Sequence, residues 1–349
     1  MISVILAGGR GLRLWPESRQ RRPKQLCKFV DNRSMLDHTI DRLINLGSSR
    51  IVVITSDDLR STVQSLVRQR PTGEIKIDVL SEPVGKNTAP AVGLALAQSL
   101  HEIRDEVLGI FPADHHILDN QAFEESVQRA IKAARQGCVA TIGITPNRPE
   151  TGYGYIEKTK WEIASLDNVY QVNSFCEKPA LDIAQTYLDS GAHMWNAGIY
   201  VAQGSTLLEE FSRYLPEIYE NILKGLDGYI SSYEHLPEIS LDYGIAEKSD
   251  RMAVVPADFG WCDLGSWNAL EDLHELDDNN NVICGDDVVA LDSRNCVIKQ
   301  CDKSIILFGV DQLLVVETDD VIFVSDRNRA QEIRSVVDTL HQMDRRDLL

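Results

Sequence analysis

The sequence has few basic residues for its length and no long hydrophobic run. Its 35 lysines and arginines stand against 53 aspartates and glutamates, which gives a formal net charge of −18 at pH 7. Such an acidic chain repels nucleic acid and anionic membrane surfaces, so we expect neither as a partner. No apolar stretch reaches transmembrane length, and Met1 leads into a strand pattern instead of a signal peptide. We therefore expect a cytoplasmic protein.

Several common site motifs are also missing. The seven cysteines are scattered and odd in number, and they show neither a disulfide framework nor the spacing of a zinc site. The glycine-rich stretch near the N-terminus has neither the Rossmann spacing nor the Gly-Lys-Ser/Thr of a P-loop. Repeats of fixed period and low-complexity segments are absent as well. We expect reduced thiols in a globular protein, and any phosphate site must be of another kind.

Short apolar runs alternate with helical patterns over the first half of the chain. The predicted strands are "ISVILA", "RIVVIT", "IKIDVL", "EVLGIF" and "CVATIGI", and the segments between them carry apolar residues on one helical face. This alternation predicts βαβ units and a doubly wound parallel sheet. After Pro146 we expect strands at 155–158, 169–175 and 198–202, and helices around 180–190 and 205–223, which extend the same sheet.

The pattern changes to short β-rich runs after residue 276. These runs include "DVVALD", "CVIKQ", "SIILFG", "LLVVE" and "VIFVS". The last segment places Ile333, Val336, Val337 and Leu340 on one face, which predicts an amphipathic helix. The predicted fold is therefore α/β: a domain with a Rossmann-like mixed sheet over residues 1–276, and a small β-rich domain, which could be a short β-helix, over residues 277–349.

Small and basic residues are concentrated in "LAGGRGLRLWPESRQRRPKQL", residues 6–26. This segment follows the first predicted strand, at the edge where open α/β sheets bind ligands. Glycines let backbone N–H groups approach an anion, and the side chains of Arg13 and Lys24 can bond its oxygens. The segment therefore predicts a site for a small polyanion. A glycine turn beside solvated cations is the alternative for this loop taken alone.

The loop and six later segments occur together in the order found in one enzyme family. These segments are "PADHHI", "TGYGYIE", "FCEKP", "WNAGIY", "LDYGIAEK" and "WCDLGSW". Residues 2–270 resemble the sugar nucleotidylyltransferases, and within that family "RLWPESR", "RPKQ" and "EPVGKNTAPA" are most similar to the mannose-1-phosphate guanylyltransferases. The resemblance implies transfer of GMP from GTP to mannose 1-phosphate, with Mg²⁺ as cofactor and GDP-mannose and pyrophosphate as products. We also expect a homodimer.

The resemblance assigns roles to individual positions. Arg13 and Lys24 would be the catalytic cations, and Asp114 and Asp263 would hold the metal. The predicted nucleotide-binding residues are Leu6, Ala7, Gly8, Gly9, Gly11, Glu82, Gly85, Asn87 and Thr88. The predicted sugar-phosphate-binding residues are Gly154, Glu177, Lys178, Asn196 and Asp242. Two positions depart from the family pattern: Leu12 stands where a hydroxyl residue is usual, and Cys176 where Val is usual.

Base and metal chemistry support some of these roles. Guanine presents N1–H and N2–H₂ together, which one carboxylate such as that of Glu82 can accept in parallel. Mg²⁺ takes one or two carboxylates and completes its shell with substrate oxygens and water, which suits Asp114 and Asp263. The adjacent His115 and His116 are expected to point in different directions, so we expect them to be structural or to support the metal ligands without binding the metal.

Alternatives remain at several positions. Asp263 and Asp242 could each cap a following helix. Glu82 could simply end a strand while Asn87 caps the next helix, and the Glu177–Lys178 pair could be a solvated strand end. For the whole chain, the alternatives are transfer of another base or to another sugar, and a non-catalytic regulatory subunit that binds nucleotide sugar. Such subunits tend to lose the phosphate and metal residues, which this chain retains.

Overall fold

The computed structural model describes residues 1–9, 11–70 and 75–349. Internal contacts divide the chain into two units. The first unit contains residues 1–8, 40–113 and 117–261, and the second contains residues 9–39, 114–116 and 262–349. The loop predicted to bind phosphate thus passes from the first unit to the second after Gly8. The sequence-based boundary between residues 276 and 277 stays a prediction.

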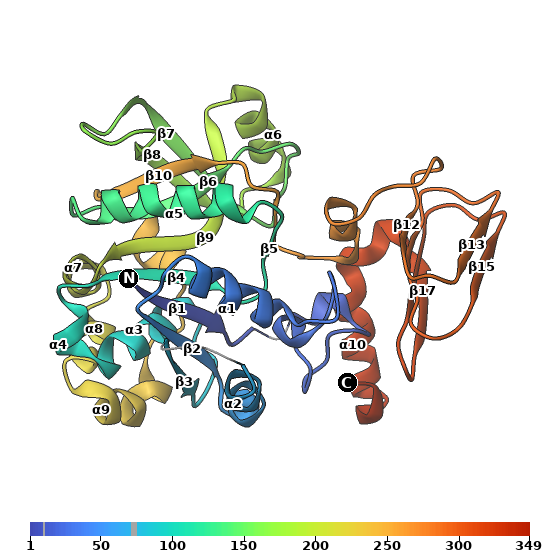
Figure 1. The fold of residues 1–349 in the computed structure, drawn as a ribbon, viewed down its shortest axis with the longest axis horizontal. Helices are drawn as coiled ribbons and strands as arrows, with labels where there is room; N and C mark the ends of the chain where they lie inside the picture. The colour runs from blue at the N-terminus through green and yellow to red at the C-terminus, as the bar shows by residue number, and fades with distance from the viewer. Residues whose placement is uncertain (10, 71–74) are drawn as a thin grey trace. The chain divides into compact units, whose positions relative to one another are not determined.

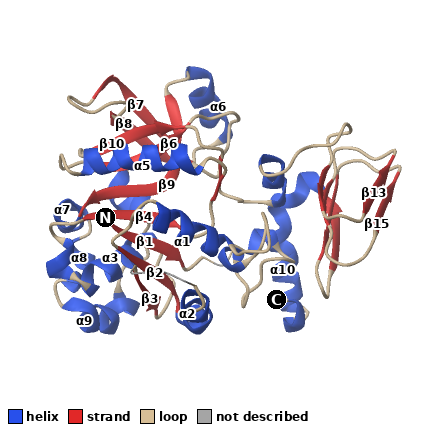
Figure 2. Ribbon diagram, viewed as in Figure 1, coloured by secondary structure: helices blue, strands red, loops and turns tan. Residues whose placement is uncertain are grey.

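The first unit is built on a nine-stranded mixed sheet with the strand order β3-β2-β1-β4-β9-β6-β10-β8-β7, and helices pack on it (Figures 1 and 2). The strands β1 to β4 pair in parallel, as do β6 and β10, whereas β9 runs antiparallel to β4 and β6. The strands are β1 (Ile2–Ala7), β2 (Arg50–Ser56), β3 (Lys76–Glu82), β4 (Val107–Pro112), β6 (Val139–Ile144), β7 (Gly154–Glu162), β8 (Tyr170–Glu177), β9 (His193–Gln203) and β10 (Met252–Ala257).

The helices of the first unit bury their apolar faces against this sheet and against one another. They are α2 (Arg60–Arg68), α3 (Thr88–Gln98), α4 (Leu100–Ile103), α5 (Asn120–Ala134), α6 (Leu181–Ser190), α7 (Gly204–Tyr214), α8 (Pro216–Ile222) and α9 (Gly225–Ser232). The helix α1 (Met35–Asn45) begins in the second unit and ends in the first. Among the described residues, no helix is long and apolar enough to cross a membrane.

The helix α3 is buried on nearly all sides, because both α8 and α9 pack on it. A Cβ atom at Gly93 would lie 2.1 Å from the hydroxyl oxygen of Tyr229, so only glycine fits there. That hydroxyl donates to the carbonyl oxygen of Pro90 at 2.9 Å. The packing at Gly93 therefore fixes α9 on α3, close to the end of β3.

Most predicted elements of the first unit are confirmed, with differences that have physical reasons. The strand β10, "MAVVPA", was not predicted; Pro256 usually argues against an interior strand. The helical pattern expected between the strands "IKIDVL" and "EVLGIF" is broken at Ser99, whose φ of −142° separates α3 from α4. The helix α9 was also not predicted, since its eight residues include two glycines.

The second unit contains the predicted β-rich region. The pairs β12–β14, β14–β16 and β13–β15 are all parallel, so strands two apart along the chain stack as in a β-helix. The strand β17 then closes one sheet in antiparallel pairing with β16. The strands are β12 (Val282–Cys284), β13 (Val288–Leu291), β14 (Val297–Lys299), β15 (Ile305–Phe308), β16 (Leu313–Glu317) and β17 (Ile322–Asp326).

The predicted C-terminal helix is confirmed as α10 (Ile333–Gln342). Ile333 and Val337 of this helix are buried in a core that also contains Leu14 and Trp15 of the N-terminal loop. The short 3₁₀ turn η1 (Leu12–Leu14) packs against α10. Leu12, the departure from the family pattern, packs against the same core, so its apolar side chain has a structural role.

Candidate active site

A cavity of about 400 Å³ in the second unit brings together five of the predicted site residues. Arg13 and Lys24 line it with the two predicted metal ligands, Asp114 and Asp263. Its complete lining is Gly11, Leu12, Arg13, Leu14, Lys24, Asp114, Asp263, Leu264, Gly265 and Arg334. Arg334 was not predicted, because nothing in a surface arginine near the start of an amphipathic helix signals a ligand.

Lys24 is the central cation of this cavity. Its Nζ atom lies 2.7 Å from Oδ2 of Asp114, and it also donates to the main-chain carbonyl oxygen of Asp263. Burial by itself would raise the pKa of Asp114, but the charges of Lys24 and His115 and the hydrogen bond from Lys24 outweigh it, so this pKa lies below its ordinary value. Asp114 is therefore ionised at neutral pH, as a metal ligand must be.

Gly11 allows the loop to approach Lys24 closely. Its φ of +60° lies in the left-handed region, and a Cβ atom there would lie 2.4 Å from the Cβ atom of Lys24. The carbonyl oxygen of Gly11 accepts a hydrogen bond from Oγ of Ser18 at 2.7 Å, which holds the turn in place. Gly9, by contrast, has no atom within 4 Å of the position that a Cβ would take.

Asp263 does not cap the helical turn that follows it. Its Oδ1 atom accepts a hydrogen bond from the backbone N–H of Gly265 at 2.9 Å, and the next 3₁₀ turn begins at Trp267 without a side-chain cap. The capping alternative is therefore wrong for this residue. In the parts of the chain that are described, no cluster of three or more His, Cys, Asp or Glu side chains is placed to hold a metal. The donor set at this cavity is two carboxylates, which fits Mg²⁺ with substrate oxygens and water completing its shell.

In the first unit, Glu82 ends β3 and is buried, with 7% of its surface exposed. Its Oε1 atom accepts a hydrogen bond from the hydroxyl of Tyr233 at 2.5 Å. Its Oε2 atom would lie 2.6 Å from a Cβ at Gly8, so a larger residue there would force the carboxylate of Glu82 to move. Burial raises the pKa of Glu82 to about 7, although the hydrogen bond from Tyr233 opposes this shift. Tyr233 was not predicted, because it lies outside every quoted motif.

The other residues predicted to bind nucleotide in the first unit lie at the ends of strands or in turns. The backbone of Leu6 and Ala7 ends β1, and Gly85 lies between β3 and α3. Asn87 caps α3, with its side-chain oxygen accepting from the N–H of Thr88 at 2.9 Å. The hydroxyl of Thr88 in turn accepts from the N–H of Leu241 at 2.8 Å. The capping alternative is thus confirmed for Asn87, and its contact with nucleotide stays a prediction.

Glu177 ends β8 beside Gly154 of β7, and Lys178 follows it. Gly154 is opposite Glu177 in the strand register, and a Cβ atom at Gly154 would lie 2.5 Å from Oε2 of Glu177. Nζ of Lys178 lies 2.9 Å from Oε1 of Glu177. Burial and the charge of Asp242 raise the pKa of Glu177, whereas Lys178 lowers it. The side chain of Glu177 is largely buried, so it is not a solvated strand end, whereas that of Lys178 is 58% exposed and the alternative stays open for Lys178.

Asp242 accepts hydrogen bonds and does not cap the π-helical turn that starts at its own position. Its Oδ1 atom accepts from the hydroxyl of Tyr200 at 2.5 Å and from Nδ2 of Asn196 at 2.9 Å. Oδ1 of Asn196 accepts from Oγ1 of Thr141 at 2.8 Å. The capping alternative for Asp242 is therefore wrong. Tyr200 was not predicted, although its position four residues after Asn196 on β9 places both side chains on one face of the strand.

Aromatic side chains lie next to these residues in the first unit. The rings of Tyr153 and Trp195 meet edge to face at 5.2 Å, and those of Tyr153 and Trp261 at 5.1 Å. The guanidinium of Arg148 lies 5.2 Å from the ring centre of Trp195. These side chains form an aromatic cluster.

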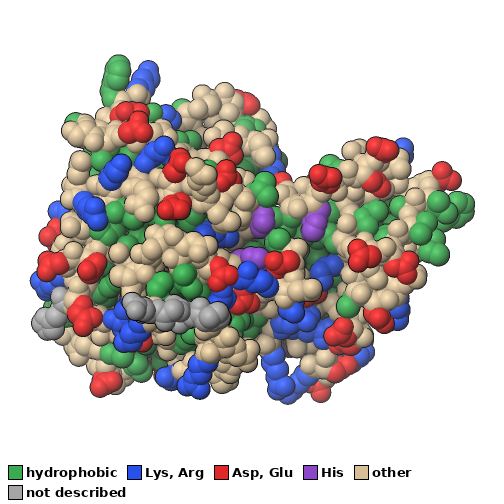
Figure 3. Space-filling model, viewed as in Figure 1, with side chains coloured by type: hydrophobic (Ala, Val, Ile, Leu, Met, Phe, Trp, Pro, Cys, Tyr) green, Lys and Arg blue, Asp and Glu red, His purple; other side chains and the backbone are tan. Residues whose placement is uncertain are grey.

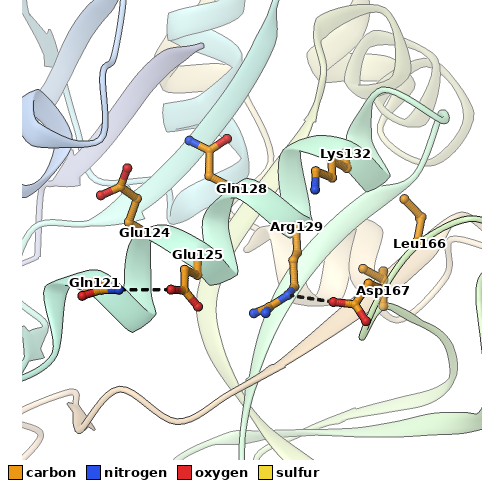
Figure 4. Close-up of a pocket in the computed structure, with 9 residues that line it drawn as sticks. Gln121, Glu124, Glu125, Gln128, Arg129, Lys132, Leu166 and Asp167 are labelled. Carbon is orange, nitrogen blue, oxygen red and sulfur yellow. Dashed lines mark hydrogen bonds and ion pairs between the residues drawn. The ribbon is translucent and has the colours of Figure 1, made fainter.

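A second hollow lies on the exposed face of α5, but none of the predicted site residues lines it (Figure 4). Arg129 of α5 is 3.7 Å from Asp167, and Gln121 donates to Glu125 along the helix. Acidic, basic and amide side chains alternate there without a buried polar group. This surface is therefore not the candidate site.

Comparison with known proteins gives two matching family models. A nucleotidyl transferase family matches residues 2–280, and a mannose-phosphate isomerase/GMP-like β-helix domain matches residues 286–340. The chain is 36% identical to a putative mannose-1-phosphate guanylyltransferase of Vibrio cholerae, over 99% of this chain and 75% of that protein. It is also 36% identical to a mannose-1-phosphate guanylyltransferase of Escherichia coli, with the same coverage of 99% and 75%.

A solved structure supports the same relationship. The crystal structure of mannose-1-phosphate geranyltransferase from Thermus thermophilus superposes with a TM-score of 0.89 at 35% identity, and the match covers 97% of this chain and 99% of that one. The predicted fold, a mixed α/β nucleotidyltransferase domain followed by a small β-helix-like domain, is thereby confirmed.

Proposed function

The chain belongs to the mannose-1-phosphate guanylyltransferases of the nucleotidyl transferase family, and on this premise we propose that it transfers GMP from GTP to mannose 1-phosphate. A phosphate oxygen of the sugar attacks the α-phosphorus of GTP, the bond from that phosphorus to the oxygen bridging to the β-phosphate breaks, and pyrophosphate leaves. The products are GDP-mannose and pyrophosphate. Because such a transfer is mainly a matter of positioning anions and neutralising charge, the protein must supply cations at the phosphates.

The observation that carries this proposal is the cavity shared by Arg13, Lys24, Asp114 and Asp263. Lys24 is held by Asp114 at 2.7 Å, so its ammonium is ordered before any substrate binds. An ordered cation needs little rearrangement to stabilise the charge that develops on the phosphates. Arg13 is exposed, and its guanidinium can form bidentate hydrogen bonds with the triphosphate.

Asp114 and Asp263 are the residues that would hold Mg²⁺. The lowered pKa of Asp114 keeps it ionised, and the hydrogen bond from Gly265 fixes the carboxylate of Asp263. When bound, the metal would supply positive charge to the phosphate oxygens and help to orient them. Lys24 contacts both aspartates, one through its carboxylate and one through its carbonyl oxygen, and so orders the two ligands.

Base and sugar would be recognised by residues of the first unit. The buried carboxylate of Glu82, fixed by Tyr233, is suited to accept the N–H groups of guanine. Glu177 would accept hydrogen bonds from sugar hydroxyls, and Lys178 would bind the sugar phosphate. The amide of Asn196 is already engaged by Tyr200, Asp242 and Thr141, so its main contribution would be to position Asp242.

We also expect the enzyme to form a homodimer through its β-rich end. Four apolar side chains on the outer faces of β13 and β15 are 44–71% exposed: Val289, Leu291, Ile306 and Phe308. Hydrophobic side chains gather over these strands in the space-filling view (Figure 3). An apolar strip of this kind is suited to a second copy of the chain. Sedimentation of the purified protein would test the expectation.

The activity is tested by measuring pyrophosphate release across a panel of nucleoside triphosphates and sugar 1-phosphates. With Mg²⁺ present, the pair of GTP and mannose 1-phosphate should give the highest kcat/KM. A mock preparation from host cells that lack the protein, made in the same way, serves as the control for contaminating activity. A higher kcat/KM with another base or sugar would favour a different transferase, and binding of GDP-mannose without turnover of any pair would favour the regulatory subunit.

A further inference from the structure

Arg334 lines the phosphate cavity but has no role in the function as proposed above. It is the second residue of α10, the helix that follows the β-helix-like strands, and it lines the same cavity as Arg13 and Lys24. Its side chain is exposed. Across residues 1–9, 11–70 and 75–349, it is engaged in no ion pair or side-chain hydrogen bond. A long guanidinium therefore stands at the cavity without a carboxylate partner.

The charges at the cavity show why a further cation is needed. The positive charge of Lys24 is already offset by the carboxylate of Asp114 at 2.7 Å. Asp263 adds a further negative charge to the lining. Taken together, Lys24, the two aspartates and one Mg²⁺ would carry a net charge of +1, so they leave most of the charge of a triphosphate uncompensated. Among the described residues that line the cavity, the cations that remain to balance that charge are Arg13 and Arg334.

The packing of α10 indicates which wall of the cavity Arg334 occupies. The helix packs on the turn η1, which contains Arg13. The two guanidiniums therefore come from elements in contact, whereas Lys24 bridges the two aspartates. The aspartates and their metal would serve the α-phosphate, where the bond is made. Arg13 and Arg334 are then left for the β- and γ-phosphates. Guanidinium groups bind phosphate oxygens with two parallel hydrogen bonds.

We propose that Arg334 binds the β- and γ-phosphates of GTP, and hence the pyrophosphate product, together with Arg13. This inference rests on the proposed function, because it assigns a further residue to the same reaction. It gives the end of the chain a part in substrate binding: the β-helix-like region positions α10, and α10 presents one phosphate-binding side chain.

The reverse reaction separates this role from other contributions, since pyrophosphate and GDP-mannose then enter as separate substrates. Arg334→Gln should raise KM for pyrophosphate by about tenfold, as expected for one lost charge-assisted interaction, and should change KM for GDP-mannose by less than about twofold. Arg334→Lys keeps the charge and should recover part of the loss. Arg329→Gln is the matched control, because Arg329 lies just upstream, is paired with Glu332 and does not line the cavity.

The outcomes are distinguishable. An unchanged KM for pyrophosphate in Arg334→Gln, or equal changes in the KM values of both substrates, would overturn the role of Arg334. The same increase in Arg329→Gln would show a general charge effect and would also overturn it. If the wild-type protein converts no GDP-mannose at all, the proposed function fails. Calorimetric titration of wild type and Arg334→Gln with magnesium pyrophosphate then still tests Arg334, and equal affinities reject its role.

Discussion

The hydroxyl of Tyr233 donates to Oε1 of Glu82 across 2.5 Å, although the two residues are 151 positions apart in the chain. The contact fixes one oxygen of a buried carboxylate, while the other oxygen packs over Gly8. Tyr233 thereby sets the orientation in which Glu82 could accept hydrogen bonds from a base. The pair also places an ionisable group with a pKa of about 7 inside the first unit.

Substitutions at this pair should change selection of the base. Glu82→Gln replaces an acceptor with an amide donor that faces the donors of guanine, at a cost of about 1–3 kcal/mol. The ratio of kcat/KM for GTP to that for ITP, which lacks the N2 amine, should therefore fall. Tyr233→Phe should lower the ratio less, because the carboxylate remains. Tyr229→Phe is a matched control, since its hydroxyl bonds to the carbonyl oxygen of Pro90 and not to Glu82. A native ratio in Glu82→Gln would mean that guanine is read elsewhere.

The raised pKa of Glu82 should also make stability depend on pH. Glu82 titrates at about 7 in the folded protein against an ordinary value of 4.5. The folded state binds the proton of Glu82 more tightly than the unfolded state does. The resulting stabilisation is complete below pH 4.5 and is lost as the pH rises through about 7. Between those limits the free energy of unfolding of the wild type should fall by about 3 kcal/mol relative to Glu82→Gln.

Urea denaturation of the ligand-free proteins at about pH 5 and about pH 8.5 measures this difference. The comparison with Glu82→Gln removes the contributions of all other titrating groups, because both proteins share them. Parallel pH profiles for the two proteins would show that the carboxyl of Glu82 titrates near its ordinary value in the folded state.

Gly11 and Gly9 of the phosphate loop should differ in their tolerance of a methyl group. Gly11→Ala forces a left-handed residue to carry a Cβ and places it 2.4 Å from the Cβ of Lys24. The backbone strain alone costs about 1–2 kcal/mol, and displacement of Lys24 should also lower kcat. Gly9→Ala meets no atom within 4 Å and should leave the midpoint of thermal unfolding unchanged. Equal stability losses in both variants would contradict the geometry of this turn.

Lys178 should act on the sugar phosphate and not on the nucleotide. Lys178→Ala removes the ammonium that pairs with Glu177, and it should raise KM for mannose 1-phosphate by about tenfold while KM for GTP changes little. Lys160→Ala, an exposed lysine of β7, provides the control for a simple change in net charge. If both KM values rise together, Lys178 does not discriminate between the two anions.

Elements marked by local patterns were predictable, and contacts made over long distances were not. Strands such as β1 and helices such as α5 follow from apolar periodicity, which reports directly on burial. Asp114 and Asp263 were predicted as metal ligands from the resemblance of their motifs, and the cavity they share depends on tertiary packing. Tyr233 and Arg334 lie outside any motif, and only the folded chain shows what they contact.

The roles of individual side chains were the least predictable part of the site. Short polar residues at strand ends can bind ligands or cap helices, and the sequence does not distinguish the two. The structure separates them case by case: Asn87 caps α3, whereas Asp242 accepts hydrogen bonds from Tyr200 and Asn196. The difference depends on neighbours that come from other strands.

Asp263→Asn tests the metal site with little risk to the fold. The side-chain oxygen of asparagine can still accept the hydrogen bond from the N–H of Gly265 that Oδ1 of Asp263 accepts at 2.9 Å. The carbonyl oxygen that binds Lys24 belongs to the main chain and is retained. What is lost is the negative charge that a hard cation requires, so the Mg²⁺ concentration for half-maximal turnover should rise by at least about tenfold. Asp338→Asn, on the exposed face of α10, makes the same charge change outside the cavity and should behave as wild type. Should Asp263→Asn show native turnover at limiting Mg²⁺, the metal is held without Asp263, and Asp114 would have to be the only carboxylate ligand from this cavity.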